Sequence, residues 1–505
     1  MSKAKQVSLF PKGDAQPLDV EDRKTDEIVI GFVGPIGSGI SFSAELFSQI
    51  MKSRFAYDGR TVKISTIIND CSRLVGEPIV LSTDEKRTEK LQKLGTLLRE
   101  KFGHKYLVEK TIADINLQRG LKEGPPVGRR YFTVIDSIKH PEEVLRLREV
   151  YGETFWLIGV FAPDEVRKRR LANNGHRENY IVDITKRDED EGVRAGQRVR
   201  DAMFLADFFI RNDGENDIKL KSTIDRFLDI IFGIGVQTPT HDESAMYAAA
   251  SAAAGSACLS RQVGAVIATA EGEIIGIGNN DVPKFQGGLY SVEDKELDHR
   301  CHQWRGKICH NDARKEEILH GIVRILREDG IIDDKKKQKA FQALQKSDIR
   351  NLIEFSRAVH AEMEAIIAVG RNGKSGLRGA TLYSTTFPCH NCARHIVASG
   401  IHKVIYIEPY TKSLAISLHE DAISINESDV GSKVVFLQYE GVAPKNMIRM
   451  FKDRGPRKQN GKILLTEAAE AQPVSLAPLD GFQTREQLVV AHVNKIELSS
   501  NPSMG

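Results

Sequence analysis

Two short polar motifs, separated by one expected strand, constrain the fold of this chain more than any other feature. His360 and Glu362, in the sequence HAE, open a helix-like stretch, and Cys389 and Cys392, in PCHNC, open another about thirty residues later. The strand-like segment ATLYSTT lies between them. The two cysteines are one helical turn apart and can present both sulfurs to one metal ion. With His360 as a third ligand, a fourth position stays open for water.

The residue types match the pattern H-x-E…P-C-x-x-C, which is the signature of zinc-dependent nucleobase deaminases. Bound Zn²⁺ lowers the pKa of its water to about 7 and makes a nucleophile available. Glu362 is the expected catalytic residue, because it can take the water proton, protonate the ring nitrogen and later protonate departing ammonia. The structural alternatives are unrelated buried cysteines or a closed zinc knot with His390 as fourth ligand, but adjacent helical residues point apart.

The N-terminal half alternates apolar and charged segments. EIVIGFVG, TVKISTIIN, YFTVIDS and TFWLIGVFAP have the composition of buried strands, and helical segments such as PEEVLRLREVYG separate them. Such alternation predicts a parallel sheet covered on both faces by helices. The first strand is followed by GPIGSGIS, a phosphate-binding P-loop pattern. Its candidate nucleotide-binding residues are Gly34, Gly37, Ser38, Gly39 and Ser41.

This P-loop lacks its usual cation. Ile40 stands where the pattern G-x-x-x-x-G-K-[ST] has lysine, which argues against efficient phosphoryl transfer. Asp136, at the end of YFTVIDS, is placed like a Walker-B acid. Three interpretations of this unit stay open: an active kinase, a nucleotide sensor and a degenerate scaffold.

The length of 505 residues and the change of pattern along the chain predict two domains. We expect a flexible leader at 1–25, a P-loop kinase-like α/β domain at 26–237, a metal-dependent domain at 238–470 and a C-terminal tail at 471–505. A charged, mainly helical insertion is expected at about 284–355. The predicted fold class is therefore α/β.

The C-terminal motifs and their surroundings resemble the deoxycytidylate deaminase family. The resemblance is carried by RQVGAVIA, GIGNNDVP, HAEMEAII and PCHNCARHIVASGIHKVIY, and it covers most of residues 240–410 apart from the insertion. It implies the three-layer α/β/α cytidine-deaminase fold, a Zn²⁺ cofactor and a free deoxycytidine nucleotide as substrate. It also implies that Asn280 contacts the sugar hydroxyl, and a turn residue is the alternative. Glu364 stands where family members have Asn, which leaves the choice between dCTP and dCMP open.

The whole chain is similar to the anti-phage dCTP/dCMP deaminases of bacteria, which place a P-loop kinase-like domain before an insertion-bearing deaminase. EFSRAVHAEMEAI, GGLYS and EPYTKSLAISLHEDAI carry this similarity. It implies a defence enzyme that depletes dCTP and dCMP by converting them to dUTP and dUMP plus ammonia. It further implies a homo-oligomer, specifically a hexamer, allosteric control by a deoxynucleotide such as dTTP, and a small inhibitory RNA as partner.

Composition bears on the alternatives. Lys+Arg 72 against Asp+Glu 69 leaves a net charge of +3, and 7% of residues are aromatic. A polynucleotide deaminase that edits RNA or single-stranded DNA would need a basic, aromatic-lined groove. A non-catalytic nucleotide-sensing module would need no acid–base glutamate such as Glu362. The absence of a signal peptide and of a long apolar run predicts a cytoplasmic protein with no membrane partner.

The insertion holds a second group of possible ligands. Five His and Cys residues lie close together in its sequence: His299, Cys301, His302, Cys309 and His310. Their spacing fits no tight C-x₂-C knuckle, so a second zinc site is the weaker of the two metal predictions.

Overall fold

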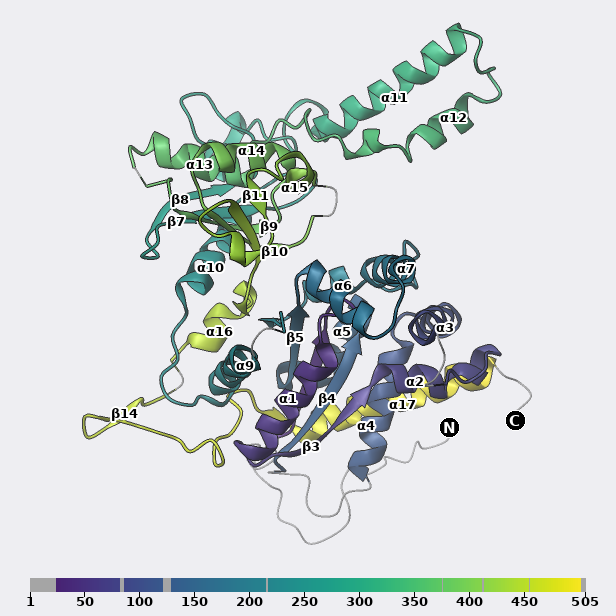
Figure 1. Cartoon of the computed structure of the whole chain (residues 1–505), viewed down its shortest axis with the longest axis vertical. Helices are drawn as coiled ribbons and strands as arrows, with labels where there is room; N and C mark the ends of the chain where they lie inside the picture. The colour runs from purple at the N-terminus through teal and green to yellow at the C-terminus, as the bar shows by residue number, and fades with distance from the viewer. Residues whose placement is uncertain are drawn as a thin grey trace, which may run out of the picture.

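The computed structural model describes residues 24–81, 86–120, 129–214, 217–374, 376–410, 413–453 and 455–500. Within them, strands form two six-stranded sheets and two small two-stranded ribbons, and helices lie on both faces of each large sheet (Figure 1). The α/β class predicted from the sequence is confirmed. Residues 1–23, most of the predicted leader, lie outside the described residues. No helix in the described ranges is long and apolar enough to cross a lipid bilayer.

The N-terminal sheet has the strand order β13-β6-β5-β2-β4-β3. Its five longer strands are parallel, and the short β13 pairs with β6 in the antiparallel sense. The strands are β2 (Ile28–Val33), β3 (Asp58–Lys63), β4 (Tyr131–Ile138), β5 (Phe155–Phe161), β6 (Phe208–Arg211) and β13 (Gly441–Val442). The central position of β2 places the P-loop that follows it in the middle of the sheet edge.

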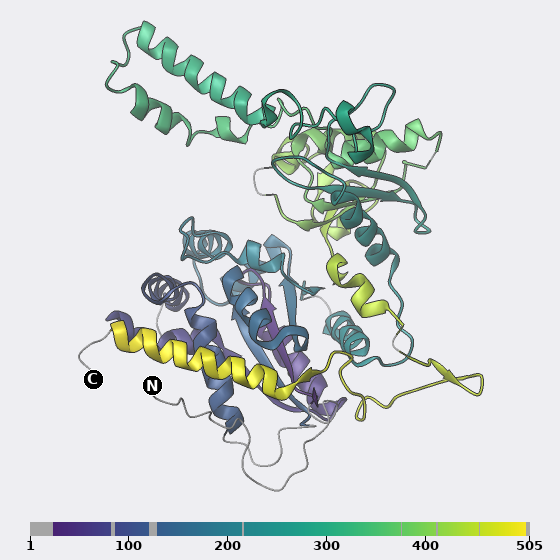
Figure 2. The ribbon, with the colours of Figure 1, turned by 180° about the vertical axis from the view of Figure 1, so that it is seen from behind.

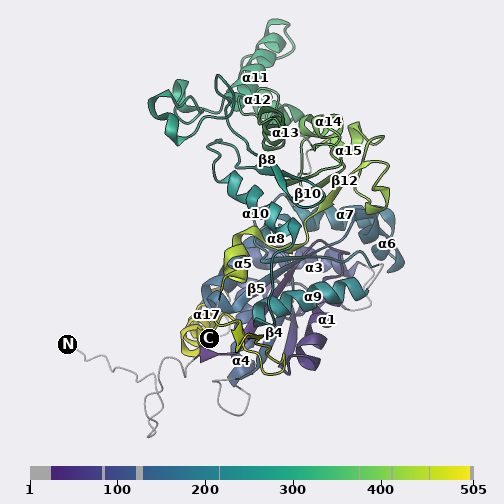
Figure 3. The same cartoon turned by 90° about the vertical axis from the view of Figure 1, so that its left-hand side faces the viewer.

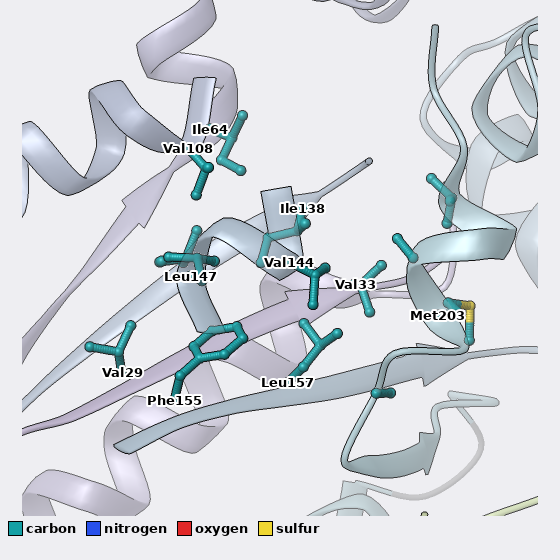
Figure 4. Close-up of a cluster of buried hydrophobic side chains, with 14 of the residues drawn as sticks. Val29, Val33, Ile64, Val108, Ile138, Val144, Leu147, Phe155, Leu157 and Met203 are labelled. Atoms are coloured by element: carbon teal, nitrogen blue, oxygen red, sulfur yellow. The ribbon is translucent and has the colours of Figure 1, made fainter. Parts of the chain in front are cut away.

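Alternating side chains of β2 build two separate cores. Ile28, Ile30 and Phe32 join a buried cluster with α1 and α9, whereas Val29 and Val33 face α2, α4 and α5 (Figure 4). The helices of this part are α1 (Ile40–Ser53), α2 (Ile64–Asp70), α3 (Arg87–Phe102), α4 (Tyr106–Gly120), α5 (Pro141–Tyr151), α6 (Asp164–Asn173), α7 (Glu178–Glu189), α8 (Val199–Met203) and α9 (Asp217–Phe232).

The C-terminal sheet has the order β11-β12-β10-β9-β7-β8. β7 runs antiparallel to both of its neighbours, and the remaining strands are parallel to one another. The strands are β7 (Gly264–Ala268), β8 (Ile274–Asn279), β9 (Thr381–Thr386), β10 (Lys403–Glu408), β11 (Ile423–Ser424) and β12 (Val434–Gln438).

Three layers are visible in the packing of β7. Ala265 and Ile267 belong to the buried cluster of α13 (Ala361–Arg371) and α14 (His390–Ala398). Val266 and Ala268 are buried with residues of α10 (His241–Ala253) on the other face. Successive strand residues point to opposite faces, so this division confirms the predicted α/β/α arrangement.

The region predicted as a helical insertion projects away from the C-terminal sheet (Figures 1 and 2). It contains α11 (His310–Glu328) and α12 (Lys337–Leu344), which contact each other. A shorter helix, α15 (Ala415–Leu418), packs beside α14 nearer the sheet.

The last part of the chain returns to the N-terminal sheet, which differs from the predicted boundaries of 238–470 and 471–505. β13 extends that sheet, and the long α17 crosses α4 and α5 (Figure 2). Between them lie α16 (Met447–Phe451), the ribbon β14 (Lys458–Gln459) with β15 (Lys462–Ile463), and β16 (Ala477–Pro478), which pairs with β1 (Lys24–Thr25); α17 spans Leu479–Ser500. The segment packs because α17 buries one apolar face there.

Loss of this packing should destabilise the N-terminal part. Phe482 on α17 is 2% exposed, contacts the ring of Tyr151 and lies under the guanidinium of Arg119. We expect Phe482→Ala to lower the free energy of unfolding by about 3–5 kcal/mol, the usual cost of such a cavity. Urea unfolding followed by Trp156 fluorescence in a Trp304→Phe background measures it, since the chain has 2 tryptophans.

The matched control for this measurement lies on the same helix. Leu488 of α17 is 66% exposed, so Leu488→Ala should leave the unfolding midpoint close to that of the parent. Equal midpoints for the Phe482 and Leu488 variants would show that α17 contributes little to the stability of the sheet.

Candidate active site

Two helix starts bring three possible metal ligands together. His360 immediately precedes α13, Cys389 immediately precedes α14, and Cys392 lies in the first turn of α14. The Nδ1 atom of His360 is 3.3 Å from the Sγ of Cys389 and 3.3 Å from the Sγ of Cys392. Within the described residues this is the one group of three or more His, Cys, Asp or Glu residues whose ligand atoms all lie within 4.8 Å of one another.

The donor set fits zinc. A tetrahedral ion with Zn–S bonds near 2.3 Å and Zn–N bonds near 2.0 Å separates nitrogen from sulfur by roughly 3.5 Å, close to the observed spacing. Three donors leave a fourth coordination position. Glu362 lies at the edge of the cluster, with its Oε2 3.4 Å from the Sγ of Cys392. Ser384 on β9 donates a hydrogen bond of 3.3 Å to the other oxygen of that carboxylate.

The electrostatics of the cluster also favour a cation. Glu362 is 4% exposed, and burial raises the pKa of its carboxyl. A hydrogen bond from Cys392 and a second from His360 lower the pKa of Cys389. The hydrogen bond with Cys389, together with burial, raises the pKa of the Cys392 thiol. Three acidic side chains thus share one buried site, and a divalent cation there would stabilise their charged forms together.

A cavity of about 460 Å³ opens above the cluster. Its lining includes His360, Glu362 and Cys389, together with the aromatic side chains Phe387 and Tyr410. The volume lies in the range of about 300–1,000 Å³ that is usual for small-molecule sites. The cavity is therefore large enough for a nucleotide beside the carboxylate and the three donors.

The N-terminal part contributes to this cavity. Arg200 and Asp201 of α8 belong to its lining, although Arg200 lies 160 residues before His360 in the chain. α8 lies on the side of the N-terminal part that faces the C-terminal sheet (Figure 3). Sequence reasoning missed Arg200, because no local pattern marks a residue that reaches a site on another sheet.

Asn280 lines the cavity, as its predicted role requires. Its Oδ1 accepts a hydrogen bond of 2.7 Å from the backbone N–H of Val263, and its Nδ2 donates one of 2.8 Å to the carbonyl of Arg261. The Oδ1 atom can accept a second hydrogen bond, and the Nδ2 atom can donate a second one. The geometry therefore gives Asn280 a loop-fixing role, and the predicted contact with a sugar hydroxyl stays a prediction.

Glu364 does not belong to the described lining of this cavity. It is 5% exposed, and Arg371 donates a hydrogen bond of 2.7 Å to its Oε1. The ion pair with Arg371 neutralises the charge that distinguishes Glu364 from asparagine. An effect of this residue on phosphate recognition would have to act through the packing of α13.

The histidines and cysteines of the insertion do not assemble into a group of three metal donors in the described chain. Cys301, Cys309 and His310 line the cavity instead. The Nδ1 of His299 lies 3.3 Å from the hydroxyl of Tyr290, and its ring stands beside Trp304. The second zinc site stays a prediction.

The P-loop has the local geometry expected from its glycines. Gly37 and Gly39 have φ values of 81° and 78°, the left-handed region that favours glycine. A Cβ on Gly34 would lie 2.1 Å from the carbonyl oxygen of Val160, so this position also requires glycine. Ser41 donates a hydrogen bond of 2.7 Å to Asp136, the residue placed like a Walker-B acid. Ser38 is fully buried.

These features place the C-terminal part of the chain in the class of nucleobase deaminases that pair a His/Cys/Cys cluster with a buried glutamate. Comparison with known families agrees. Residues 239–408 match the family described as "Cytidine and deoxycytidylate deaminase zinc-binding region". The chain therefore contains a domain of this family.

Individual proteins similar to this chain are the following. The deoxycytidylate deaminase of Enterobacteria phage T2 is 49% identical over 55 residues, which are 11% of this chain and 29% of the phage protein. The chain thus spans under a third of the length of that relative. The dCMP deaminase of cyanophage S-TIM5 in complex with dCMP and dUMP is 18% identical with a TM-score of 0.23, covering 40% of this chain and 99% of the phage chain. Shikimate kinase from Acinetobacter baumannii is 12% identical with a TM-score of 0.23, covering 41% and 93%.

Proposed function

We propose that this protein uses zinc to hydrolyse free deoxycytidine nucleotides, dCMP and dCTP, to dUMP and dUTP plus ammonia. The observation that carries the proposal is the position of Glu362. Its carboxylate lies 3.4 Å from the Sγ of Cys392, beside three convergent donors and in the wall of a cavity of about 460 Å³. A site that only bound nucleotides would have no use for a buried acid–base group there.

The residues divide the chemistry as follows. His360, Cys389 and Cys392 would hold the zinc ion, which when bound supplies an acidified water. Glu362 accepts the proton of the attacking water and passes it to the ring nitrogen beside the attacked carbon. The carbon–amine bond then breaks, and Glu362 delivers the second water proton to the departing ammonia. Burial raises the pKa of the Glu362 carboxyl, and a group in this role must both accept and donate a proton.

Ammonia release by the purified chain tests the substrate class. We expect turnover of dCMP and dCTP, with and without dTTP, and little turnover of CTP, cytidine or a cytosine-containing single strand. Turnover of the single strand alone would contradict the proposal and favour a polynucleotide deaminase. Binding of all nucleotides without ammonia release would favour a sensing module.

Arg200 offers a way to test phosphate recognition. It lines the cavity from α8, and its Nη2 lies 3.7 Å from Glu189, longer than a direct hydrogen bond. We expect Arg200→Ala to raise the KM for dCTP by about tenfold or more, the effect of losing one charge-assisted contact. The low kcat/KM for cytidine, which has no phosphate, should change little.

The control for Arg200 is Arg198→Ala. Arg198 lies two residues earlier, pairs with Asp201 and is not part of the described lining of the cavity. Steady-state kinetics of both variants with dCTP, dCMP and cytidine give the comparison. Equal falls in kcat/KM for cytidine and dCTP would show that Arg200 does not act on the phosphates.

The wider role proposed here is antiviral. By resemblance to the bacterial anti-phage deaminases, the chain would act in the cytoplasm as a homo-oligomer, a hexamer, that depletes deoxycytidine nucleotides during infection. The same resemblance supports control by dTTP and by a small inhibitory RNA. Phage challenge of bacteria carrying the wild-type chain or Glu362→Ala, with dCTP and dCMP pools measured, tests this role. Equal protection by the two chains would contradict it.

A further inference from the structure

A second cavity, of about 450 Å³, lies over the P-loop. Ile36, Gly37 and Ser41 of the loop form one wall, and residues of α3 and α7 form others. The side chain of Ile40, at the position of the usual lysine, is 6% exposed and belongs to the apolar core of α1. Any cation that contacts a phosphate here must therefore come from another element.

Lys139 is one such cation. It follows β4, the strand that carries Asp136, and its side chain lines the cavity. The Nζ atom donates a hydrogen bond of 3.0 Å to the carbonyl oxygen of Gly34 and is 2.9 Å from Asp188. The positive charge thus reaches the P-loop from the neighbouring strand of the sheet.

Asp188 stands where an anion is expected. Its Oδ2 accepts a hydrogen bond of 2.7 Å from the backbone N–H of Ile36, and its Oδ1 pairs with Lys139. A P-loop offers its backbone N–H groups and its cation to phosphate. In this structure both contacts go to a carboxylate from the last turn of α7, which is 1% exposed.

Two buried side chains of the same cavity each have one polar atom without a partner in the described chain. Arg99 is 1% exposed and its Nη1 has no hydrogen bond within the described chain. Gln92 is 4% exposed and its Oε1 has none. Both residues line the cavity from α3. Buried polar atoms of this kind are candidates for contact with a polar ligand.

The charge of the lining matches a polyphosphate. Four cationic side chains line the cavity against the single carboxylate of Asp188; they are Arg87, Arg99, Lys139 and Arg170. Arg99 is also paired with Glu143, and Lys139 is paired with Asp188. Ser41 and Asp136 are hydrogen-bonded to each other and are placed to hold a magnesium ion.

We propose that this cavity binds a magnesium-complexed nucleoside di- or triphosphate, with Lys139 replacing the lysine missing at position 40 and Asp188 displaced by the phosphates. The inference concerns a different site from the deaminase and does not depend on it. Asp188 then acts as an internal competitor. Its removal should strengthen phosphate binding, whereas removal of Lys139 should weaken it.

Isothermal titration calorimetry of the full-length, zinc-loaded chain tests the proposal. Magnesium pyrophosphate and magnesium ADP are the probes. A Glu362→Ala background with excess dCMP keeps the deaminase site occupied without turnover. Lys139→Met should weaken binding of ADP by at least about tenfold, and Asp188→Asn should strengthen it by about tenfold, as expected for contacts to charged groups. Lys168→Met, on the exposed face of α6, is the control and should bind like the parent.

The gain expected for Asp188→Asn protects the test against misfolding, because a damaged domain does not bind more tightly. If neither probe binds to the parent or to Asp188→Asn, the cavity is not a phosphate site. If ADP binds but Asp188→Asn is no tighter, or Lys139→Met is no weaker, the roles assigned to these two residues are wrong. None of these outcomes bears on deamination, which is measured separately.

Discussion

Replacing Glu362 with glutamine is expected to lower kcat for dCMP deamination by about 10²- to 10⁴-fold, the usual contribution of a positioned acid–base group. Glutamine has nearly the same shape and can still accept the hydrogen bond that Ser384 donates. It cannot accept and return a proton at neutral pH. The zinc content should not change, because Glu362 lies beside the donor cluster and is not one of its three members.

The measurement combines ammonia release with metal analysis of the same preparation. Glu364→Gln is the matched control, because Glu364 lies on the same helix, is also buried and is paired with Arg371 outside the described lining of the cavity. We expect this variant to keep a kcat near that of the parent. Substantial turnover by Glu362→Gln with full zinc would remove Glu362 from the proton transfers.

The donor cluster could be predicted from the sequence because its information is local. Each of the two helix starts is marked by a motif of at most five residues. One strand joins them, and this short connection brings them together at one edge of the sheet. The α/β class followed for a similar reason, since strands such as Ile28–Val33 show their burial in their own composition. Asn280 lines the cavity and Glu364 is outside its described lining, but the predicted sugar contact of Asn280 stays a prediction.

The contacts that were missed join residues far apart in the chain. The return of residues 441–500 to the first sheet depends on pairing between β13 and β6, more than 200 residues earlier. One signal was present: Phe482, Val489 and Val493 recur at helical spacing and are all buried. The polar residues between these three positions made the helical spacing of the apolar residues hard to recognise in the sequence. Lys139 and Asp188 carry no local mark of proximity to the P-loop, so the replacement cation could be found only in the folded chain.

Cys392→Ser is expected to remove the metal as well as the activity. Four ligands of a structural zinc site together give about 10–16 kcal/mol of binding, so the loss of one thiolate should weaken zinc binding by more than about 100-fold. Serine is a poor substitute, because its hydroxyl stays protonated at neutral pH where a zinc-bound cysteine is a thiolate. The melting temperature should fall as well, since a bound ion would stabilise three buried acidic side chains.

Competition with a chelator measures this affinity, and Cys258→Ser provides the control. Cys258 lines the same cavity but is not a member of the donor cluster, so its variant should bind zinc like the parent. The variants at Glu362 and Cys392 separate the roles of two side chains whose Oε2 and Sγ atoms lie 3.4 Å apart. Loss of turnover with zinc retained assigns Glu362 to proton transfer, and loss of both assigns Cys392 to the metal. Full zinc in Cys392→Ser at the same chelator concentration would exclude Cys392 from the ligand set. The proposal of a catalytic zinc held by three protein ligands would then be wrong.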